Sequence, residues 1–201
     1  MYAGSKSRKR ICDKDKLMIE NKEQLQDYLL ADKKALGIKR KRPKILSDEI
    51  WRYERILRYT EYYSNKRMRI QSAIHRYRLK QLSVKYGFSI PLNVFDAGLA
   101  IVHLGPVIVS PYAKVGKNCR IQAMTVIGAT NGETRAPVIG DNVYISTGAK
   151  LIGNISIADG TAIGAGAVVV KSIQEKNITV GGVPAKKISD NSSAIHLQNI
   201  R

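Results

Sequence analysis

An aliphatic residue recurs at every sixth position over much of the second half of this 201-residue chain. The positions are Val109, Val115, Ile121, Ile127, Ile139, Ile145, Leu151, Ile157, Ile163 and Val169. Smaller or β-branched residues lie four places after most of them: Ala113, Cys119, Thr125, Val143, Ala149, Ile155, Thr161 and Ala167. A helix has a period of about 3.6 and a strand a period of two, so neither gives this spacing. Three short strands per turn do, and the pattern predicts a parallel β-helix whose stacked coils share one core.

A polar stretch interrupts the repeat once. The sixth position after Ile127 is Glu133, which is not aliphatic. The surrounding segment, 129–137, reads ATNGETRAP and is rich in turn-forming and polar residues. It predicts a loop that projects from the coil before the repeat resumes at Ile139.

A second interruption lies near the start of the repeat. Ile101 and Val107 keep the spacing of six, but Val109 follows Val107 by only two places. The interrupting stretch contains His103. Departures from an otherwise regular pattern are expected at functional sites, so we expect a functional site at the break that contains His103.

Helical spacing of apolar residues precedes the coil. Three helices are predicted, over 22–36, 47–64 and about 67–85. Gly37 suits the end of the first helix, and Ser47 is expected to cap the start of the second. The sequence thus predicts a mainly β fold with a small helical domain in front of the β-helix.

The chain is expected to divide into four parts: a basic tail at 1–18, a helical domain at 19–88, a β-helix at 89–190 and a C-terminal tail at 191–201. Residues 1–16 and 191–201 are expected to be frayed. The formal net charge of +18 is concentrated in the first half. Residues 1–90 carry 24 Lys and Arg against 10 Asp and Glu, whereas 91–201 carry 10 against 6.

This basic excess points to an acidic partner of the helical half, such as nucleic acid, anionic lipid or an anionic glycan. The run IKRKRPK at 38–44 is either a nuclear-import or nucleic-acid patch or a solvated linker between helices. We favour the linker. No specific nucleic-acid binding is expected, whereas peripheral contact with anionic surfaces is compatible with the charge.

The two cysteines, Cys12 and Cys119, are too few for a disulfide framework or a zinc site. Cys119 falls on a small inward position and is interpreted as structural. No stretch approaches the roughly 18 consecutive apolar residues of a membrane span, and the N-terminus lacks the apolar core of a secretory signal. We therefore expect a cytoplasmic protein.

Three motifs together are typical of one known family: IVHLGPVIV at 101–109, IGDNVYISTGAKLIGNISIADGTAIGAGAVVVK at 139–171 and GGVPAKKI at 181–188. The region resembles the hexapeptide-repeat acyltransferases, above all the serine acetyltransferases and the related acetyltransferases of polysaccharide gene clusters. The helical half resembles the leader of the polysaccharide-cluster subgroup. The resemblance implies a left-handed β-helix and O-acetyl transfer with acetyl-CoA as co-substrate.

An alcohol attacks a thioester well only when a base removes its proton, and neutral imidazole suits that task near pH 7. His75 falls in a basic helix and His196 in the tail, so His103 is the candidate catalytic base. The serine enzymes place one acid about one coil earlier and another directly before this histidine. Phe88 and Val102 take those two places here.

Asp96, seven residues before His103, is the nearest acid upstream. It is a candidate second catalytic residue that orients the imidazole. Alternatively it forms a corner in the sequence FDAG, and a backbone carbonyl orients His103 instead.

The resemblance leaves the acceptor open. Arg135 matches an arginine of the serine enzymes' projecting loop, which suggests substrate binding, but Ala136 replaces the histidine that follows it. A charged amino acid needs both its ammonium and its carboxylate paired, and these losses remove partners. We therefore predict acetylation of a sugar in a surface polysaccharide or its precursor, with serine O-acetylation in cysteine biosynthesis as the alternative.

The donor is expected along a groove between neighbouring coils. Thr147, Gly148 and Ala165 match the family's contact positions for the pantetheine arm. Coenzyme A also carries phosphates, and Lys171 and Lys186 are the cations expected to meet them.

The family's sites lie between subunits, so the resemblance implies a homotrimer or a pair of trimers joined through the helical leader. The thioester oxygen gains negative charge during the reaction, and backbone N–H groups at Gly128 or Ala129 are candidates to receive it.

Two other classes of function are weaker. A metal hydrase on the same scaffold needs three histidines per zinc, and the coil carries one, so no metal is expected. A nucleic-acid-binding module would use the basic leader, but its aromatic residues, such as Trp51 and Tyr53, keep a helical spacing suited to packing.

Overall fold

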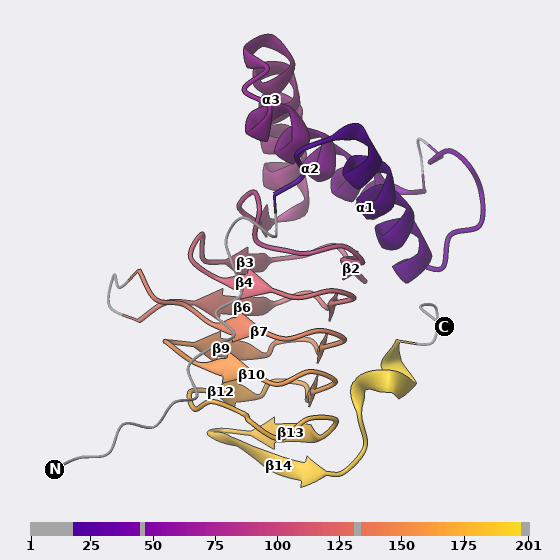
Figure 1. Cartoon of the computed structure of the whole chain (residues 1–201). Helices are drawn as coiled ribbons and strands as arrows, with labels where there is room; N and C mark the ends of the chain where they lie inside the picture. Colours follow the sequence, from indigo (N-terminus) through magenta and orange to yellow (C-terminus); the bar gives the residue numbers. More distant parts are fainter. Residues whose placement is uncertain (1–17, 45–46, 131–133, 198–201) are drawn as a thin grey trace, which may run out of the picture.

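The computed structural model describes residues 18–44, 47–130 and 134–197, and Figure 1 traces the chain. Within these ranges, three α-helices precede the coil: α1 (Lys22–Ala35), α2 (Glu49–Asn65) and α3 (Arg69–Tyr86). They lie together at one end of a stack of short strands (Figure 1). The three helices predicted from apolar spacing are confirmed.

The strands form three sheets, which are the three faces of a triangular coil. The first face contains β1 (Phe88–Ser89), β3 (Val107–Val109), β6 (Thr125–Gly128), β9 (Lys150–Ile152) and β12 (Val168–Val169). The second contains β4 (Lys114–Val115), β7 (Val138–Ile139) and β10 (Ser156–Ile157). The third contains β2 (Ala100–Ile101), β5 (Arg120–Ile121), β8 (Tyr144–Ile145), β11 (Ala162–Ile163), β13 (Thr179–Gly182) and β14 (Ala185–Ser189). Neighbours pair in parallel except β13 and β14, which are antiparallel.

The residues of the six-residue repeat fill the interior of this left-handed β-helix. Each aliphatic residue of the repeat stacks on its counterpart in the next coil, as Ile121 does on Ile145. All ten aliphatic positions are buried, and so are the smaller residues four places later. Burial raises the pKa of the Cys119 thiol to about 12, so Cys119 acts as a small apolar core residue. The fold predicted from the repeat is confirmed.

The three corners of the coil differ. The turns 102–106, 122–124, 146–149 and 164–167 join the third face to the first, and we name this edge the His103 corner. The edge from the first face to the second carries the predicted projecting loop. At the edge from the second face to the third, Asn118, Asn142 and Asn177 adopt left-handed backbone conformations, with φ of 57°, 56° and 58°. We name it the asparagine corner.

Buried charged side chains of the helical domain close the open end of the coil. Arg58 of α2 is fully buried and pairs with Asp32 of α1, Nε to Oδ2 at 2.8 Å, and with Glu61, Nη1 to Oε2 at 3.0 Å. Arg58 also donates to the carbonyl oxygens of Phe95 and Asp96, each at 2.8 Å. A buried guanidinium persists only when its donors are satisfied in this way.

Carboxylates of the same network accept N–H groups of the first coil. Asp32 Oδ1 accepts from the amides of Gly98 and Leu99 at 2.8 and 2.9 Å, and Glu61 Oε1 accepts from Asn93 at 2.8 Å. No strand lies beyond the first coil in the described chain, so these side chains take the hydrogen-bonding role of the missing neighbour.

The start of α2 differs from the prediction. Asp48, not Ser47, is the N-cap residue, and the helix begins at Glu49. The Asp48 side chain makes no capping hydrogen bond; it pairs with Arg40 and accepts the amide of Lys44. Arg40 donates to both oxygens of Asp48, a bidentate pair of the strong charge-assisted kind, and this pair ties the basic linker to the helix.

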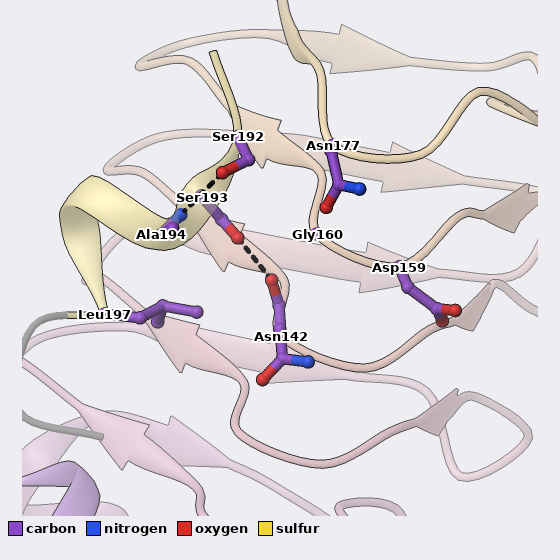
Figure 2. A pocket seen from close by; sticks show the side chains of 8 residues that line it. All are labelled: Asn142, Asp159, Gly160, Asn177, Ser192, Ser193, Ala194 and Leu197. Carbon is purple, nitrogen blue, oxygen red and sulfur yellow. Dashed lines mark hydrogen bonds between the residues drawn. The ribbon is translucent and has the colours of Figure 1, made fainter. Parts of the chain in front are cut away.

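The described part of the C-terminal tail packs against the asparagine corner (Figure 2). A 3-10 helix, Ser193–His196, places the Ser193 hydroxyl on the carbonyl oxygen of Asn142 and buries Leu197. The prediction of a frayed tail is therefore wrong for 191–197. The other expected frayed end, 1–16, lies outside the described residues, as do 198–201.

Docking of this tail is expected to weaken in acid. The His196 ring stacks on Tyr144 with ring centroids 4.0 Å apart, and burial, with Arg120 as a second cause, lowers the pKa of His196. A histidine with a lowered folded-state pKa binds protons more readily when released, so docking is stable above about pH 6.5 and weakens below it. Amide exchange over 192–197 should be faster at pH 5 than at pH 8, after correction for intrinsic rates. His196→Phe keeps the ring stack and should abolish this difference; persistence of the difference would contradict the explanation.

Candidate active site

His103 lies in an exposed turn at the helical end of the coil. The turn 102–106 joins β2 to β3 and is two residues longer than its counterpart 122–124 in the next coil. The register break seen in the sequence is therefore an enlarged corner. The ring of His103 makes no hydrogen bond or ring contact with any other part of the chain that the structure describes, which leaves it free for a substrate.

The predicted donor contacts lie on this same corner, in the coils that follow. The amide of Met124 donates to Pro106 at 2.6 Å, and Thr147 donates from its hydroxyl to Ala123 at 3.0 Å. The amide of Gly166 then donates to Thr147 at 2.9 Å. The turns are thus stacked from His103 towards the C-terminal end, and Thr147, Gly148 and Ala165 belong to them.

The backbone of this corner is accessible to a slim ligand. Gly148 and Gly166 have φ of 72° and 66°, which a residue with a side chain rarely adopts. A Cβ added at Gly166 would meet nothing within 4 Å, so the space beside it is open. Ala165 and Thr147 are also exposed. Small side chains and open backbone are what an extended pantetheine arm needs.

Asp96 does not orient His103 within one chain, which corrects the prediction. Asp96 Oδ1 accepts from the Tyr28 hydroxyl at 2.8 Å and from the amide of Ala97 at 2.7 Å, at the asparagine corner. The third-face segment between the two corners is about four residues long, so roughly 13 Å separates them. The segment from Asp96 to His103 therefore crosses the third face of the coil, and the two side chains lie at different corners.

A hollow of about 170 Å³ lies beside the His103 turn, on the side of the helical domain. Its lining residues are Leu36, Ile38, Ser47, Asp48, Glu49, Ile50, Trp51, Ile101, Val102 and Leu104. This hollow has no signal in the sequence, because it forms only where α1 and α2 meet the coil. Val102 and Leu104, the neighbours of His103 in sequence, line the hollow, whereas His103 itself does not.

The projecting loop keeps one of its two expected polar positions. Arg135 is exposed, whereas Ala136 is buried in the core with 4% of its surface exposed. Gly128 ends β6 and Ala129 follows it, at the edge between the first and second faces. In a single chain these amides lie at a different corner from His103.

The predicted phosphate-binding lysines are exposed but lie away from the His103 corner. Lys171 follows β12, and Lys186 lies in β14 opposite Gly181. Neither makes an ion pair with another described residue. The neighbouring Lys187 pairs with Glu175 and Asp190 and is therefore committed to the fold.

Other features of the described residues do not add a second site. The hollow at the asparagine corner, about 260 Å³ and drawn in Figure 2, contains none of the predicted catalytic or donor residues. No cluster of three potential metal-ligating side chains occurs in the described ranges. Among the described helices, none is long and apolar enough to cross a membrane.

Comparison with known families identifies the repeat. Residues 136–171 match the family described as bacterial transferase hexapeptide (six repeats). This part of the left-handed β-helix is therefore similar to the hexapeptide repeat of bacterial transferases.

Within that class, the chain resembles the serine acetyltransferases. It is 29% identical over 127 residues to the serine acetyltransferase of Buchnera aphidicola from Acyrthosiphon pisum, which is 61% of this chain and 46% of the relative. It is 37% identical over 100 residues to that of Mycobacterium tuberculosis, 49% of this chain and 43% of the relative. The chain thus spans about half the length of these curated relatives.

Solved structures share the fold over most of the chain. Serine acetyltransferase from Brucella abortus superposes with a TM-score of 0.70 at 24% identity, over 86% of this chain and 72% of the other. The Neisseria gonorrhoeae serine acetyltransferase in complex with serine gives 0.66 at 26% identity, over 84% and 70%. The resemblance inferred from the sequence motifs is confirmed.

Proposed function

We propose that the chain transfers the acetyl group of acetyl-CoA to the hydroxyl of an acceptor. The observation that carries this proposal is the shared corner: His103 at one end, and Thr147, Gly148 and Ala165 in the coils that follow. The similarity to serine acetyltransferases supports the same chemistry.

In the proposed reaction, His103 accepts the proton of the acceptor hydroxyl as its oxygen bonds to the thioester carbon. The carbon–sulfur bond then breaks, and the imidazolium returns the proton to the departing thiolate. Products are the acetyl ester and free coenzyme A, and the base is regenerated. The proposed donor path extends from His103 along the stacked turns towards the C-terminal coils, which leaves the helical side of the His103 turn for the acceptor.

The complete site is proposed to form between copies of the chain in a homotrimer. Apolar side chains near the His103 corner are exposed in the single chain: Leu104, Ile108 and Met124 at 47%, 48% and 58%. Burial against a neighbour would remove this surface from water. The candidates to contact acetyl-CoA bound at the His103 corner of a neighbouring copy are then Gly128, Ala129, Lys171 and Lys186.

L-serine is the first acceptor to test. The curated relatives bear the name serine acetyltransferase, so they favour L-serine over the sugar acceptor predicted from the sequence. A sugar hydroxyl is the second candidate, because buried Ala136 offers no polar contact to a charged amino acid. Nothing in the comparisons supports a polysaccharide acceptor.

A release assay for coenzyme A is expected to decide between them. The full-length protein with acetyl-CoA should release coenzyme A faster with the true acceptor than with water alone. L-serine, free monosaccharides and nucleotide-linked sugars form the panel, and mass spectrometry identifies the acetyl ester. Release no faster than the water background with every acceptor would refute the proposed function.

A further inference from the structure

We propose that Glu54 of α2 is a positioning residue for His103, holding the strand that leads into the catalytic turn. The inference rests on the proposed acetyl transfer. Glu54 is fully buried, and its Oε1 accepts the amide of Ile101 at 2.9 Å. Ile101 ends β2, two residues before His103.

The Ile101 amide points to the open edge of the sheet. On either side of Ile101, the amides of Ala100 and Val102 donate to the carbonyl oxygens of Cys119 and Ile121, in the segment that contains β5. The amide between them faces the opposite way, where the described chain provides no further strand. An unpaired buried amide is costly, so Glu54 replaces the acceptor that another coil would supply.

The far side of the turn is also held from the helical end. The amide of Gly105 donates to the carbonyl of Tyr86, and that of Val107 donates to Gly87, each at 3.2 Å. Glu54 and the end of α3 therefore hold both sides of the turn. Since β2 is only two residues long, loss of one contact is expected to displace His103 rather than to be absorbed along the strand.

The surroundings of Glu54 favour its uncharged form. Burial, with Asp32 as a second cause, raises the pKa of Glu54 well above its usual value. The second oxygen, Oε2, has no hydrogen-bond partner among the described residues. Glutamine has the same shape and also accepts through Oε1, so it is the conservative replacement.

A set of matched variants separates positioning from general stability. Glu54→Gln keeps the acceptor, Glu54→Met keeps the volume without it, and Glu54→Asp shortens the reach by one methylene. Glu61→Met is the control, because Glu61 likewise accepts a first-coil amide, that of Asn93, but far from the turn. Glu61 also pairs with Arg58, so its loss should destabilise the fold at least as much.

The readouts are kcat, KM for acetyl-CoA, melting temperature and amide exchange over 101–105. We expect kcat to fall about 10²-fold in Glu54→Met, as for a displacement of about 1 Å, with an unchanged KM for acetyl-CoA. The kcat of Glu54→Asp should lie between the values of Glu54→Met and the original chain, and Glu54→Gln should have the kcat of the original chain. Amide exchange over 101–105 should be faster in Glu54→Met and unchanged in Glu54→Gln. Glu61→Met should keep its kcat at temperatures where it is folded.

The outcomes separate the two proposals. If the original chain transfers acetyl and Glu54→Met keeps its kcat while exchange rises, the positioning role is refuted. Equal loss of kcat in Glu61→Met, or in Glu54→Gln, would also refute it. If Glu54→Met does not fold, Glu54→Asp takes its place. An unchanged kcat in Glu54→Asp with faster exchange, while Glu54→Gln keeps the original exchange, would then refute the positioning role. Absence of transfer by the original chain with every acceptor refutes the proposed function, while exchange at Ile101 still tests the hydrogen bond.

Discussion

Replacing His103 by alanine is expected to lower the kcat of acetyl transfer about 10² to 10⁴-fold, the usual contribution of a general base. Alanine removes the proton acceptor without changing the core, because His103 lies in an exposed turn and makes no hydrogen bond or ring contact with the other described residues. Affinity for coenzyme A should persist, since the donor corner continues through Thr147 and Gly148. Steady-state kinetics and calorimetric titration with coenzyme A measure the two quantities.

The other two histidines provide matched controls for this prediction. His75 lies on α3, where its ring is tilted against those of Tyr59 and Tyr63, and His196 lies on the tail. His75→Ala and His196→Ala should keep kcat within a factor of about two, because surface substitutions change little. Full turnover in His103→Ala would remove the base from the mechanism.

Replacing Arg58 by alanine is expected to destabilise the protein by about 3–5 kcal/mol, the usual cost of breaking a buried ion pair. The change leaves Asp32 and Glu61 buried without their cation and leaves the carbonyls of Phe95 and Asp96 without a donor. Urea unfolding should show a lower midpoint with a similar slope. Arg58→Lys should not restore stability, because a single ammonium cannot reach acceptors on both sides.

The control for Arg58 is another arginine of the helical domain. Arg78 on α3 is exposed, so Arg78→Ala should change the free energy of unfolding by no more than about 0.5 kcal/mol. If Arg58→Ala unfolds at the same urea concentration as Arg78→Ala, the buried network does not anchor the helices to the coil.

Repetition made the coil predictable. Each six-residue period repeats one physical requirement, an inward aliphatic at a fixed place such as Ile121 or Ile145, so the errors of single positions average out. The break around His103 is visible for the same reason, because it departs from a six-residue spacing that the sequence repeats many times. The placement of Thr147 and Ala165 beside it came from resemblance and agrees with the stacked turns.

Contacts between distant segments could not be predicted from the sequence. Arg58 and Glu61 have the composition of a solvated helix face, and only the meeting of α2 with the coil buries them. Asp96 is near His103 in sequence, but an extended strand carries it to another corner. Nothing in the sequence indicates that Ser193 and Leu197 pack against the asparagine corner, because their partners belong to turns of other coils.

The closure of the coil's first end has a consequence for self-association. A stack of parallel strands grows by accepting another strand on its exposed edge, which is the geometry of fibrils. Here side-chain carboxyl groups of the helical domain already accept the amides of Gly98 and Ile101 at the third-face edge, and at the opposite end of that face β14 turns back antiparallel over β13. On the third face, therefore, neither end offers the parallel template that end-to-end polymerisation requires.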